Sequence, residues 1–329
     1  MQAIQISRYG GRDAMQLTDV EIPQPEAGEA LLRLEYAGVN FIDVYMREGH
    51  YQHSATYGSA LPFTLGMEGA GTVEAVGADV TQVAIGDRVA YCLTRGSYAQ
   101  YATVPAWRLV KLPDNVDDQI GTAFMLQGLT AHYLSHSAFP LDSSHSCLVH
   151  AGAGGVGRLL IQLARSRGAR VIATVGSAAK AEIVRKLGAD LAIQYRDTDF
   201  EQAINEATDG TGVDVVYDSV GKDTIERSLR CLRRRGICVN YGGSSGLVAS
   251  ISPLALAEAG SVFFTRPHLA HYLTDRNELT MRADDLFASY AAAELDVNID
   301  RVLPLAEAGD AHAALESRAT IGKILLATS

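Results

Sequence analysis

Two different patterns of apolar and polar positions divide the chain near residue 120. From about residue 146 onward, short apolar runs alternate with longer segments whose apolar residues recur at helical spacing. The apolar runs predict strands over 146–151, 170–175, 191–195, 213–218, 236–241 and 261–265. The segments between them end near Gly168, Gly188, Gly210, Gly236 and Gly260, as helices that end at glycine do. Strands alternating with crossover helices predict a doubly wound parallel sheet of the α/β class.

The first 120 or so residues instead carry short alternating segments, such as 30–36 and 71–76, separated by Gly, Pro and Asp. This pattern predicts a small β-rich domain. After residue 266 the pattern returns to a helix over 275–294 and then to extended segments around 302–305 and 323–326, which we expect to rejoin the first domain. The expected division is therefore a domain of residues 1–125 rejoined by 266–329, and a domain of residues 126–265.

Composition narrows the class of partner. The chain of 329 residues has 28 Lys and Arg against 38 Asp and Glu, a net charge of -10, which argues against a polyanion such as nucleic acid. One local exception is the cluster Arg230, Arg233, Arg234 and Arg235, which we interpret as cations at a helix C-terminus before Gly236. Residues 1–5 resemble no secretion signal, and no apolar run reaches membrane-spanning length, so we expect a cytoplasmic protein.

The four cysteines form no C-x-x-C pair. Cys147 and Cys238 lie within apolar runs that predict strands, so we expect reduced and mostly buried thiols.

A glycine-rich loop is the most specific chemical signal. Gly152, Gly154 and Gly157 fit the pattern G-x-G-x-x-G between a predicted strand and a predicted helix, which is the context of a dinucleotide-binding loop. The backbone N–H groups at the start of such a helix face phosphates. The alternative interpretation is a purely structural turn.

The end of the second predicted strand indicates which dinucleotide is bound. Folds specific for NAD usually place a carboxylate there to bind the ribose 2′-hydroxyl, whereas this strand ends in Val175, Gly176 and Ser177. Lys180 follows, and a 2′-phosphate favours cations and hydroxyl donors. The residues therefore favour NADPH, with a solvated helix lysine as the alternative for Lys180.

Ordered motifs along nearly the whole chain carry a family resemblance. They are GVNFIDVY at 38–45, GMEGAG at 66–71, GDRV at 86–89, GLTA at 128–131, the glycine loop, VYDSVG at 216–221, GGSSG at 242–246, TRP at 265–267 and ESRAT at 316–320. With these motifs the chain resembles the zinc-free quinone oxidoreductase (ζ-crystallin-like) branch of the medium-chain dehydrogenase/reductase superfamily. The resemblance implies a GroES-like catalytic domain at 1–125 and 266–329, a Rossmann NADPH-binding domain at 126–265, a cleft between them, and commonly a homodimer.

Departures from the zinc-containing members concern the metal ligands. Those members carry a cysteine where this chain has Asn40 and a histidine where it has Met67, and residues 91–115 hold only Cys92 instead of a four-cysteine lobe. The sequence therefore predicts that no metal is bound. Three histidine pairs have helical spacing but no third ligand beside them, so we expect ordinary packing or surface roles. They are His132 with His136, His50 with His53, and His268 with His271.

By this resemblance Asn40, Tyr45 and Asp43 are the expected catalytic residues, with the amide and the phenol acting as neutral hydrogen-bonding groups near the nicotinamide. Helix capping by Asp43 and a half-buried packing role for Tyr45 are the alternatives. Arg266 offers either a cation to a quinone oxygen or a structural ion pair. The polar and aromatic loop 50–61 lies where the family shapes its substrate mouth.

The resemblance also implies the residues that contact NADPH, with Lys180, Gly176, Tyr195 and Arg318 at the 2′-phosphate. The expected cofactor contacts are Phe41, Thr130, Gly152, Gly154, Gly155, Val156, Gly157, Gly176, Ser177, Lys180, Tyr195, Ser219, Val220, Tyr241, Gly242, Gly243, Ser244, Pro267, His268, Leu269 and Arg318.

The expected function is reduction of quinones by hydride transfer from NADPH without a metal. A 2-alkenal, enone or enoyl-thioester reductase is the alternative on the same scaffold. A non-catalytic nucleotide-binding or RNA-binding protein is a third interpretation, which the acidic balance disfavours. We expect a small quinone or conjugated carbonyl and a second copy of the chain as partners, and neither nucleic acid nor a membrane.

Overall fold

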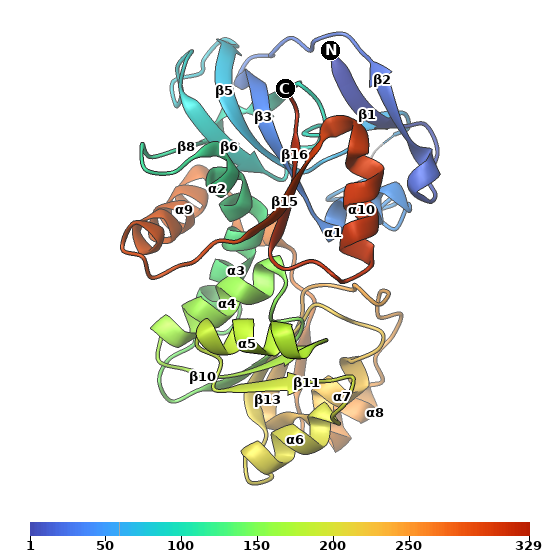
Figure 1. The fold of residues 1–329 in the computed structure, drawn as a ribbon, viewed down its shortest axis with the longest axis vertical. Coiled ribbons are helices and arrows are strands. Elements are labelled where there is room, and N and C mark those ends of the chain that lie inside the picture. The colour runs from blue at the N-terminus through green and yellow to red at the C-terminus, as the bar shows by residue number, and fades with distance from the viewer. Residues whose placement is uncertain (59) are drawn as a thin grey trace. The chain divides into compact units, whose positions relative to one another are not determined.

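The computed structural model describes residues 1–58 and 60–329, so Ser59 of the 50–61 loop lies outside the described residues. The chain forms two compact units (Figure 1). Unit 1 comprises Met1–Leu129, Leu273–Ala291 and Val297–Ser329, and unit 2 comprises Thr130–Tyr272 and Ala292–Asp296. The domain limits expected at 125/126 and 265/266 stay a prediction. The division between the units falls within α3 (Leu129–Tyr133).

Unit 1 is built on β-sheets. A three-stranded sheet has the order β2 (Met15–Asp19), β1 (Gln2–Ile6), β4 (Phe63–Thr64). A seven-stranded sheet has the order β15 (Ile299–Pro304), β16 (Lys323–Ala327), β3 (Glu29–Val39), β5 (Glu68–Val76), β6 (Arg88–Cys92), β8 (Val110–Lys111), with β7 (Tyr101–Pro105) also paired to β3. The helical elements are η1 (Arg12–Ala14), α1 (Phe41–Arg47), η2 (Ala106–Arg108), α2 (Asp118–Ala123), the π-helical turn η3 (Phe124–Gly128), α9 (Arg276–Ala291), η6 (Leu305–Glu307) and α10 (Ala308–Glu316).

Alternation along β3 explains how this sheet forms. Ala30, Leu32 and Leu34 enter the core, while Arg33 and Glu35 on the opposite face form an ion pair. The tail of the chain returns through β16, which pairs antiparallel with β3. Unit 1 is therefore discontinuous in sequence, and its largest sheet combines strands from both ends of the chain.

Unit 2 contains a six-stranded parallel sheet in the order β11, β10, β9, β12, β13, β14. The strands are β9 (Ser146–Val149), β10 (Arg170–Val175), β11 (Leu191–Gln194), β12 (Val213–Asp218), β13 (Leu232–Asn240) and β14 (Phe263–Thr265). The helical elements are η4 (Leu134–Ala138), α4 (Gly155–Ser166), α5 (Ala178–Lys186), α6 (Phe200–Ala207), α7 (Ile225–Arg230), α8 (Pro253–Glu258) and η5 (Leu269–Tyr272).

The strand order reverses between β9 and β12, so right-handed crossovers place the helices of the two halves on opposite faces of the sheet. Leu148, Ile172 and Val216 form part of the core between the sheet and α6, α7 and α8. The predicted doubly wound sheet is confirmed. The switch between β9 and β12 fixes where a ligand crevice forms in such a fold, at the carboxyl ends of the strands.

The interpretation of the arginine cluster is wrong for three of its four members. Helix α7 ends at Arg230, whereas Arg233, Arg234, Arg235 and Gly236 belong to β13. A register shift between β12 and β13 accommodates the extra residues, since Leu232 pairs with Val213 and Ile237 with Val215.

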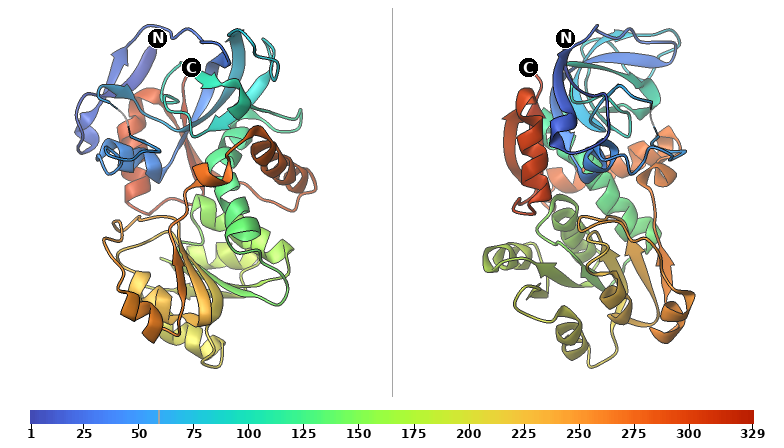
Figure 2. Two further views of the ribbon diagram at one scale, coloured as in Figure 1. Left: turned by 180° about the vertical axis from the view of Figure 1, so that it is seen from behind. Right: turned by 90° about the vertical axis from the view of Figure 1, so that its right-hand side faces the viewer.

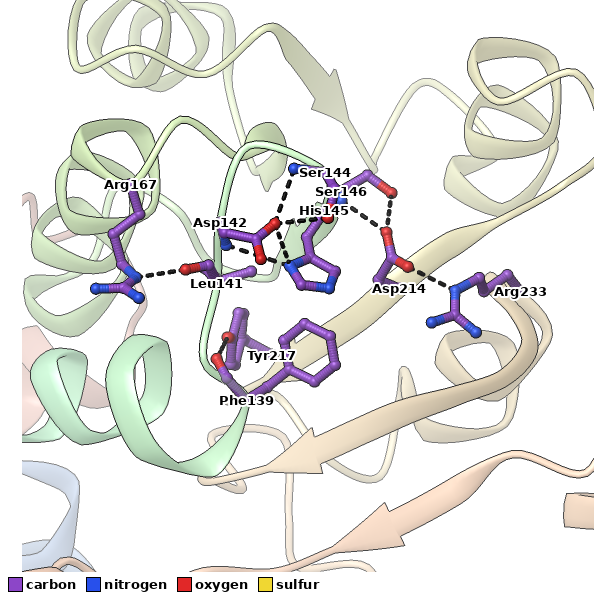
Figure 3. A network of polar contacts seen from close by, with 10 residues as sticks. All are labelled: Phe139, Leu141, Asp142, Ser144, His145, Ser146, Arg167, Asp214, Tyr217 and Arg233. Carbon is purple, nitrogen blue, oxygen red and sulfur yellow. Dashed lines mark hydrogen bonds and ion pairs between the residues drawn. The ribbon is translucent and has the colours of Figure 1, made fainter.

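The amino end of the sheet in unit 2 is held by a polar network (Figure 3). The backbone N–H and hydroxyl of Ser146 at the start of β9 both donate to Asp214 Oδ2, at 2.7 and 3.0 Å, and Arg233 donates to the other oxygen of Asp214. The Tyr217 hydroxyl donates to the carbonyls of Leu134 and Phe139. The bonds among Ser146, Asp214 and Arg233 lie at the opposite end of the strands from the glycine loop, so we assign them to stability. Tyr217 instead lies near the carboxyl end of β12, where it pairs with Val149.

Two expectations concern the whole chain. The four cysteines are free and buried as expected, and burial raises the pKa of the Cys231 thiol to about 12. Within the ranges that the structure describes, every helix is too short or too polar to cross a membrane.

Candidate functional site

The glycine loop of unit 2 follows β9 and leads into α4. A Cβ atom on Gly152 would lie 3.0 Å from Ala173 Cβ and 3.1 Å from Ile161 Cδ1, so this glycine lets α4 pack closely on the sheet. A Cβ on Gly157 would lie 2.5 Å from the Ala151 carbonyl oxygen. By contrast, a Cβ on Gly154 would contact only that carbonyl, at 3.2 Å. Gly154 is thus the position with open space beside it, where a ligand could approach the backbone.

Helix α4 begins at Gly155 with Gly154 as its N-cap. In the part of the chain that the structure describes, this helix has no side-chain cap hydrogen bond at its N-terminus. The N–H groups of a first turn have no intrahelical acceptor, and the helix dipole adds positive potential there. Backbone donors, open space and a bare helix end together fit a pyrophosphate.

The end of β10 and the start of α5 form a second part of this site. Ser177 caps α5 by accepting the N–H of Lys180 at 3.4 Å, which places Lys180 in the first turn of that helix. A Cβ on Gly176 would lie 3.3 Å from the Tyr195 hydroxyl and 3.7 Å from Arg196 Nε. The structure therefore groups a phenol and a guanidinium around Gly176, and the cation of Lys180 follows on α5. Arg196 was not predicted, although its position directly after Tyr195 was the available signal.

The loops after β12 and β13 are joined by backbone hydrogen bonds. Ser244 N–H donates to the Ser219 carbonyl at 3.0 Å, and Gly242 approaches so closely that a Cβ would lie 2.6 Å from that carbonyl. Asp218, fully buried, organises the turn: Oδ1 accepts the N–H groups of Val220 and Gly221 at 2.8 Å each. The expected contacts Ser219, Val220 and 241–244 thus lie together at the carboxyl edge of the sheet.

The sequence did not predict a group of buried polar residues that lies next to this edge. His150 at the end of β9 bonds Thr174 Oγ1 at 2.8 Å and Ser228 Oγ at 3.0 Å, and Ser228 donates to Asp218 Oδ2 at 2.7 Å. Burial lowers the pKa of His150, so its ring stays neutral. These bonds join β9, β10, β12 and α7, and we assign them to the rigidity of the edge.

Other expected contacts of unit 2 have less defined roles. Arg266 donates to the Asn240 carbonyl at 2.9 Å, which ties β14 to β13. Its role at a quinone oxygen or in an ion pair stays a prediction. Pro267, His268 and Leu269 follow directly, and burial lowers the pKa of His268. Thr130 lies on α3 and is buried. Their contact with a cofactor stays a prediction.

A buried ion pair lies at the centre of the expected catalytic residues in unit 1. Glu68 at the start of β5 and Lys323 at the start of β16 form a salt bridge with side chains 0% and 1% exposed. Asn40 completes the group, because its Nδ2 donates to Glu68 Oε2 at 2.8 Å and its Oδ1 accepts from Lys323 Nζ at 2.8 Å. The Asn40 amide also donates to the Gly38 carbonyl at 3.2 Å, so its donors are engaged within the unit.

A second buried series of hydrogen bonds, here called the buried chain, begins at Asp43, three residues after Asn40. Asp43 Oδ2 accepts the Asn40 N–H at 2.9 Å and the Tyr98 hydroxyl at 3.1 Å, so Asp43 does cap α1. Tyr98 also lies 3.1 Å from His312 Nε2 on α10. Arg47 Nη1 lies 3.1 Å from His312 Nδ1 and Arg47 Nη2 lies 2.6 Å from Glu316 Oε1, which joins α1 and α10 (Figures 1 and 2).

Protonation along this chain follows from burial. Because arginine can only donate, His312 accepts at Nδ1 and its Nε2–H points at the Tyr98 oxygen. Burial raises the pKa of Asp43 to about 7 and, with the nearby Arg47, lowers the pKa of His312 to about 3. The buried chain thus contains a carboxyl group with a pKa of about 7 and a neutral imidazole, with the Tyr98 hydroxyl between them.

Tyr45 lies on α1 among other aromatic rings. Its ring centroid is 6.0 Å from those of Phe41 and Tyr51 and 6.1 Å from that of His50, and the residue is 7% exposed. The packing alternative for Tyr45 is therefore at least part of its role. Contact of Tyr45 and Phe41 with substrate or cofactor stays a prediction. Arg318 belongs to unit 1 and Lys180 to unit 2, so their joint action at a phosphate also stays a prediction.

The residues at the zinc position of related enzymes do not suit a metal. Asn40 offers an amide already bonded to Glu68 and Lys323, so a dication there would lie beside a fixed ammonium group. Residues 1–58 and 60–329 contain no group of three or more His, Cys, Asp or Glu side chains arranged to hold a metal ion. His132 and His136 stack on each other at 4.0 Å.

Two family models match the chain in the order that the fold suggests. One described as the alcohol dehydrogenase GroES-like domain matches residues 26–114, and one described as zinc-binding dehydrogenase matches residues 155–273. A β-rich unit with this match and a doubly wound unit with a glycine loop define a medium-chain dehydrogenase/reductase.

Relatives specify the branch. The chain is 41% identical to a 2-haloacrylate reductase of a Burkholderia species, over 99% of this chain and 98% of that one. It is 39% identical to quinone oxidoreductase 1 of Escherichia coli (strain K12), over 98% of each chain. The solved structure of Escherichia coli quinone oxidoreductase complexed with NADPH matches with a TM-score of 0.95 and 39% identity, covering 99% of this chain and 100% of that one. This chain belongs to the zinc-free quinone oxidoreductase branch of the superfamily, and the predicted resemblance is confirmed.

Proposed function

We propose that this protein reduces quinones by transfer of hydride from NADPH, without a metal. The observation that carries the proposal is the carboxyl edge of the sheet in unit 2, where a bare helix start and an open glycine lie beside a strand end that has a phenol and cations in place of a carboxylate. Membership of a branch whose members are named quinone oxidoreductase, and the NADPH complex of one of them, support it.

The cofactor fits the donor set of unit 2. The first turn of α4 suits the pyrophosphate, and Lys180, Tyr195 and Arg196 suit the dianionic 2′-phosphate. The joined loops after β12 and β13 suit the ribose and nicotinamide, because they present backbone groups on a rigid edge.

The reaction asks little acid–base chemistry of the protein. Bound NADPH supplies a hydride, and the quinone that accepts it takes one proton from water to become the hydroquinone. The residues of unit 1 therefore need to orient the acceptor and exclude water. We assign the orienting role to Tyr45 and to the α1 segment that begins at Asn40. Asp43 acts within its buried chain, holding the start of that segment.

Reduction of conjugated alkenes is the second candidate. It is favoured by the 41% identity to a 2-haloacrylate reductase, in which the acceptor is a carbon–carbon double bond next to a carbonyl carbon. The two candidates differ in where the transferred hydrogen ends up. In a reduced alkene it is bonded to carbon and does not exchange with water, whereas in a hydroquinone it is on a hydroxyl group and does exchange.

The test is an acceptor panel with NADPH deuterated at C4. Initial rates with benzoquinone, a 2-alkenal, a 2-haloacrylate and crotonyl-CoA give kcat/KM for each acceptor, and mass spectrometry reports deuterium in the product. We expect the highest kcat/KM for the quinone. Stable deuterium at carbon together with a higher kcat/KM for an alkene would assign the second candidate instead. No turnover of any acceptor, together with RNA binding at two salt concentrations, would favour the non-catalytic alternative.

We also propose a homodimer in the cytoplasm. The support is the family resemblance and the open edge of the sheet in unit 2, where β14 leaves Phe263 62% exposed. An unpaired edge strand with apolar side chains is a template for pairing with another strand. Sedimentation of the wild type and of Phe263→Lys tests this assembly, with a dimer expected for the first and a monomer for the second.

A further inference from the structure

We propose that the Glu68–Lys323 ion pair is a positioning device for hydride transfer, which fixes the Asn40 carboxamide and the turn η3 by hydrogen bonds. Glu68 lies within the family motif at 66–71, but neither Glu68 nor Lys323 was predicted to be part of the site. The inference rests on the proposed function only for its rate measurement.

The hydrogen bonds of the pair reach separate elements of unit 1. Glu68 Oε2 accepts from Lys323 and from Asn40, while Glu68 Oε1 accepts the backbone N–H of Leu126 in η3. Lys323 Nζ donates in turn to Asn40 Oδ1. The pair therefore joins the N-terminus of α1, the first residue of β5, the first residue of β16 and the π-helical turn that leads to Gly128 and Leu129.

The pair also determines how the Asn40 amide faces. An ammonium group can only donate and a carboxylate can only accept, so Oδ1 must face Lys323 and Nδ2 must face Glu68. The Gly38 carbonyl, which also accepts from Nδ2, favours the same orientation. The charges therefore hold the start of α1, and with it Tyr45 one turn later, in a single arrangement.

Stability alone does not account for such a pair. Replacing a fully buried ion pair with apolar residues of similar volume is often neutral or stabilising, because the desolvation of both charges is removed. Room for the pair also requires a bare backbone, since a Cβ on Gly38 would lie 1.9 Å from Glu68 Oε2 and 2.8 Å from Lys323 Nζ. A buried pair with every partner in place instead specifies one geometry, which is what orientation-controlled catalysis needs.

Two double variants separate positioning from stability. Glu68→Leu with Lys323→Met removes both charges and every hydrogen bond of the pair. Glu68→Gln with Lys323→Met also removes both charges but retains an amide. Its oxygen can accept from Leu126 N–H, whereas its nitrogen then faces the Asn40 Nδ2 donor, so only the hydrogen bond to η3 is kept. Asn40→Ala, which leaves the ion pair intact, tests whether the effect passes through the carboxamide.

We expect the Leu/Met variant to keep a Tm near that of the wild type and a KM for NADPH within about threefold, while kcat falls more than tenfold. The Gln/Met variant should recover only part of kcat, because it keeps the hydrogen bond to η3 but not the one to Asn40. Asn40→Ala should lower kcat similarly and should cause little further loss in the Leu/Met background, as residues acting in one unit do.

Hydrogen exchange gives a readout that needs neither NADPH nor turnover. The Leu126 amide should exchange faster in the Leu/Met variant and at nearly the wild-type rate in the Gln/Met variant. If either variant folds poorly, the other together with Asn40→Ala still decides the question. A kcat within threefold of wild type in Leu/Met, or an equal loss in Leu/Met and Gln/Met, would overturn the positioning role. Absence of NADPH-dependent activity in the wild type would instead reject the proposed function and leave the exchange result standing.

Discussion

The candidate regions of unit 1 and unit 2 are built from different kinds of chemical group. The edge of the sheet in unit 2 is built from backbone groups and from glycines that leave space, whereas the centre of unit 1 is built from buried charged and polar side chains. The glycine loop and the start of α4 in the first region lie within 152–157, so this part of it is local in sequence. The second joins Asn40 to Lys323, 283 residues apart. We therefore expect loss of one side chain to leave the stability of the backbone site unchanged but to destabilise the buried network.

The largest expected effect comes from leaving one charge of the buried pair alone. Lys323→Met should lower the free energy of unfolding by about 3–5 kcal/mol, because the carboxylate of Glu68 would stay buried without its cation. Urea denaturation measures this change. Adding Glu68→Gln should restore most of the loss, and equal instability of the single and double variants would contradict the account.

In unit 2 the comparison predicts a loss of affinity without a loss of stability. Lys180→Ala should weaken NADPH binding by about 10- to 150-fold, since a hydrogen bond to a charged group contributes roughly 1.5–3 kcal/mol, and should leave NADH nearly unchanged. Arg196→Ala, in the turn that follows β11, is the matched variant and should act in the same direction. Fluorescence titration with both cofactors checks this, and equal losses for the two would show that Lys180 does not contact the phosphate.

Removing one hydroxyl from the α1 segment should have a smaller effect. Tyr45→Phe should cost no more than about one to two powers of ten in kcat/KM, because a positioning group contributes less than an essential proton donor, which reaches 10²–10⁴. The pH–rate profile with a quinone should keep its shape. A loss above about a thousandfold with disappearance of one limb would make Tyr45 an obligatory acid.

The buried chain of unit 1 should show itself in the pH dependence of stability. Between pH 4.5 and 6 the folded state holds a proton on Asp43, whose pKa is raised to about 7, and none on His312, whose pKa is lowered to about 3. The unfolded chain does the reverse, so the two contributions cancel. In His312→Asn only the Asp43 contribution remains. As the pH rises from 4.5 to 6, the free energy of unfolding of this variant should therefore fall relative to that of the wild type by about 1.4 kcal/mol per pH unit. Asp43→Asn should give the opposite slope in urea titrations, and parallel curves for all three proteins would refute the cancellation.

Metal removal should have no effect on activity. The ammonium group of Lys323 already occupies the surroundings of Asn40, so a dication would be repelled there. Elemental analysis of active protein should find no stoichiometric zinc. Inactivation by a chelator with recovery on adding zinc would disprove this.

The sequence predicted what local patterns encode. Apolar alternation located β3, and apolar runs ending at glycine located the strands and helices of unit 2. It failed at Arg233–Arg235, because charged side chains on an exposed strand after a register shift look like the end of a helix. It also missed Lys323 and Glu68, because partners so far apart have no common motif. Their signal was opposite charges within the apolar runs 323–326 and 66–71, which implies burial and therefore a partner.

The place of β16 in the sheet of unit 1 has a consequence for synthesis. Thr130–Tyr272 form a nearly continuous unit that can close while the chain is still being made, but the seven-stranded sheet lacks β15 and β16 until after residue 323 has left the ribosome. During that interval Glu68 has no cation and β3 has an unpaired edge beside α1. The nascent protein is therefore able to complete its nucleotide-binding unit first, and the strand that carries Lys323 acts as the last step that locks the other unit.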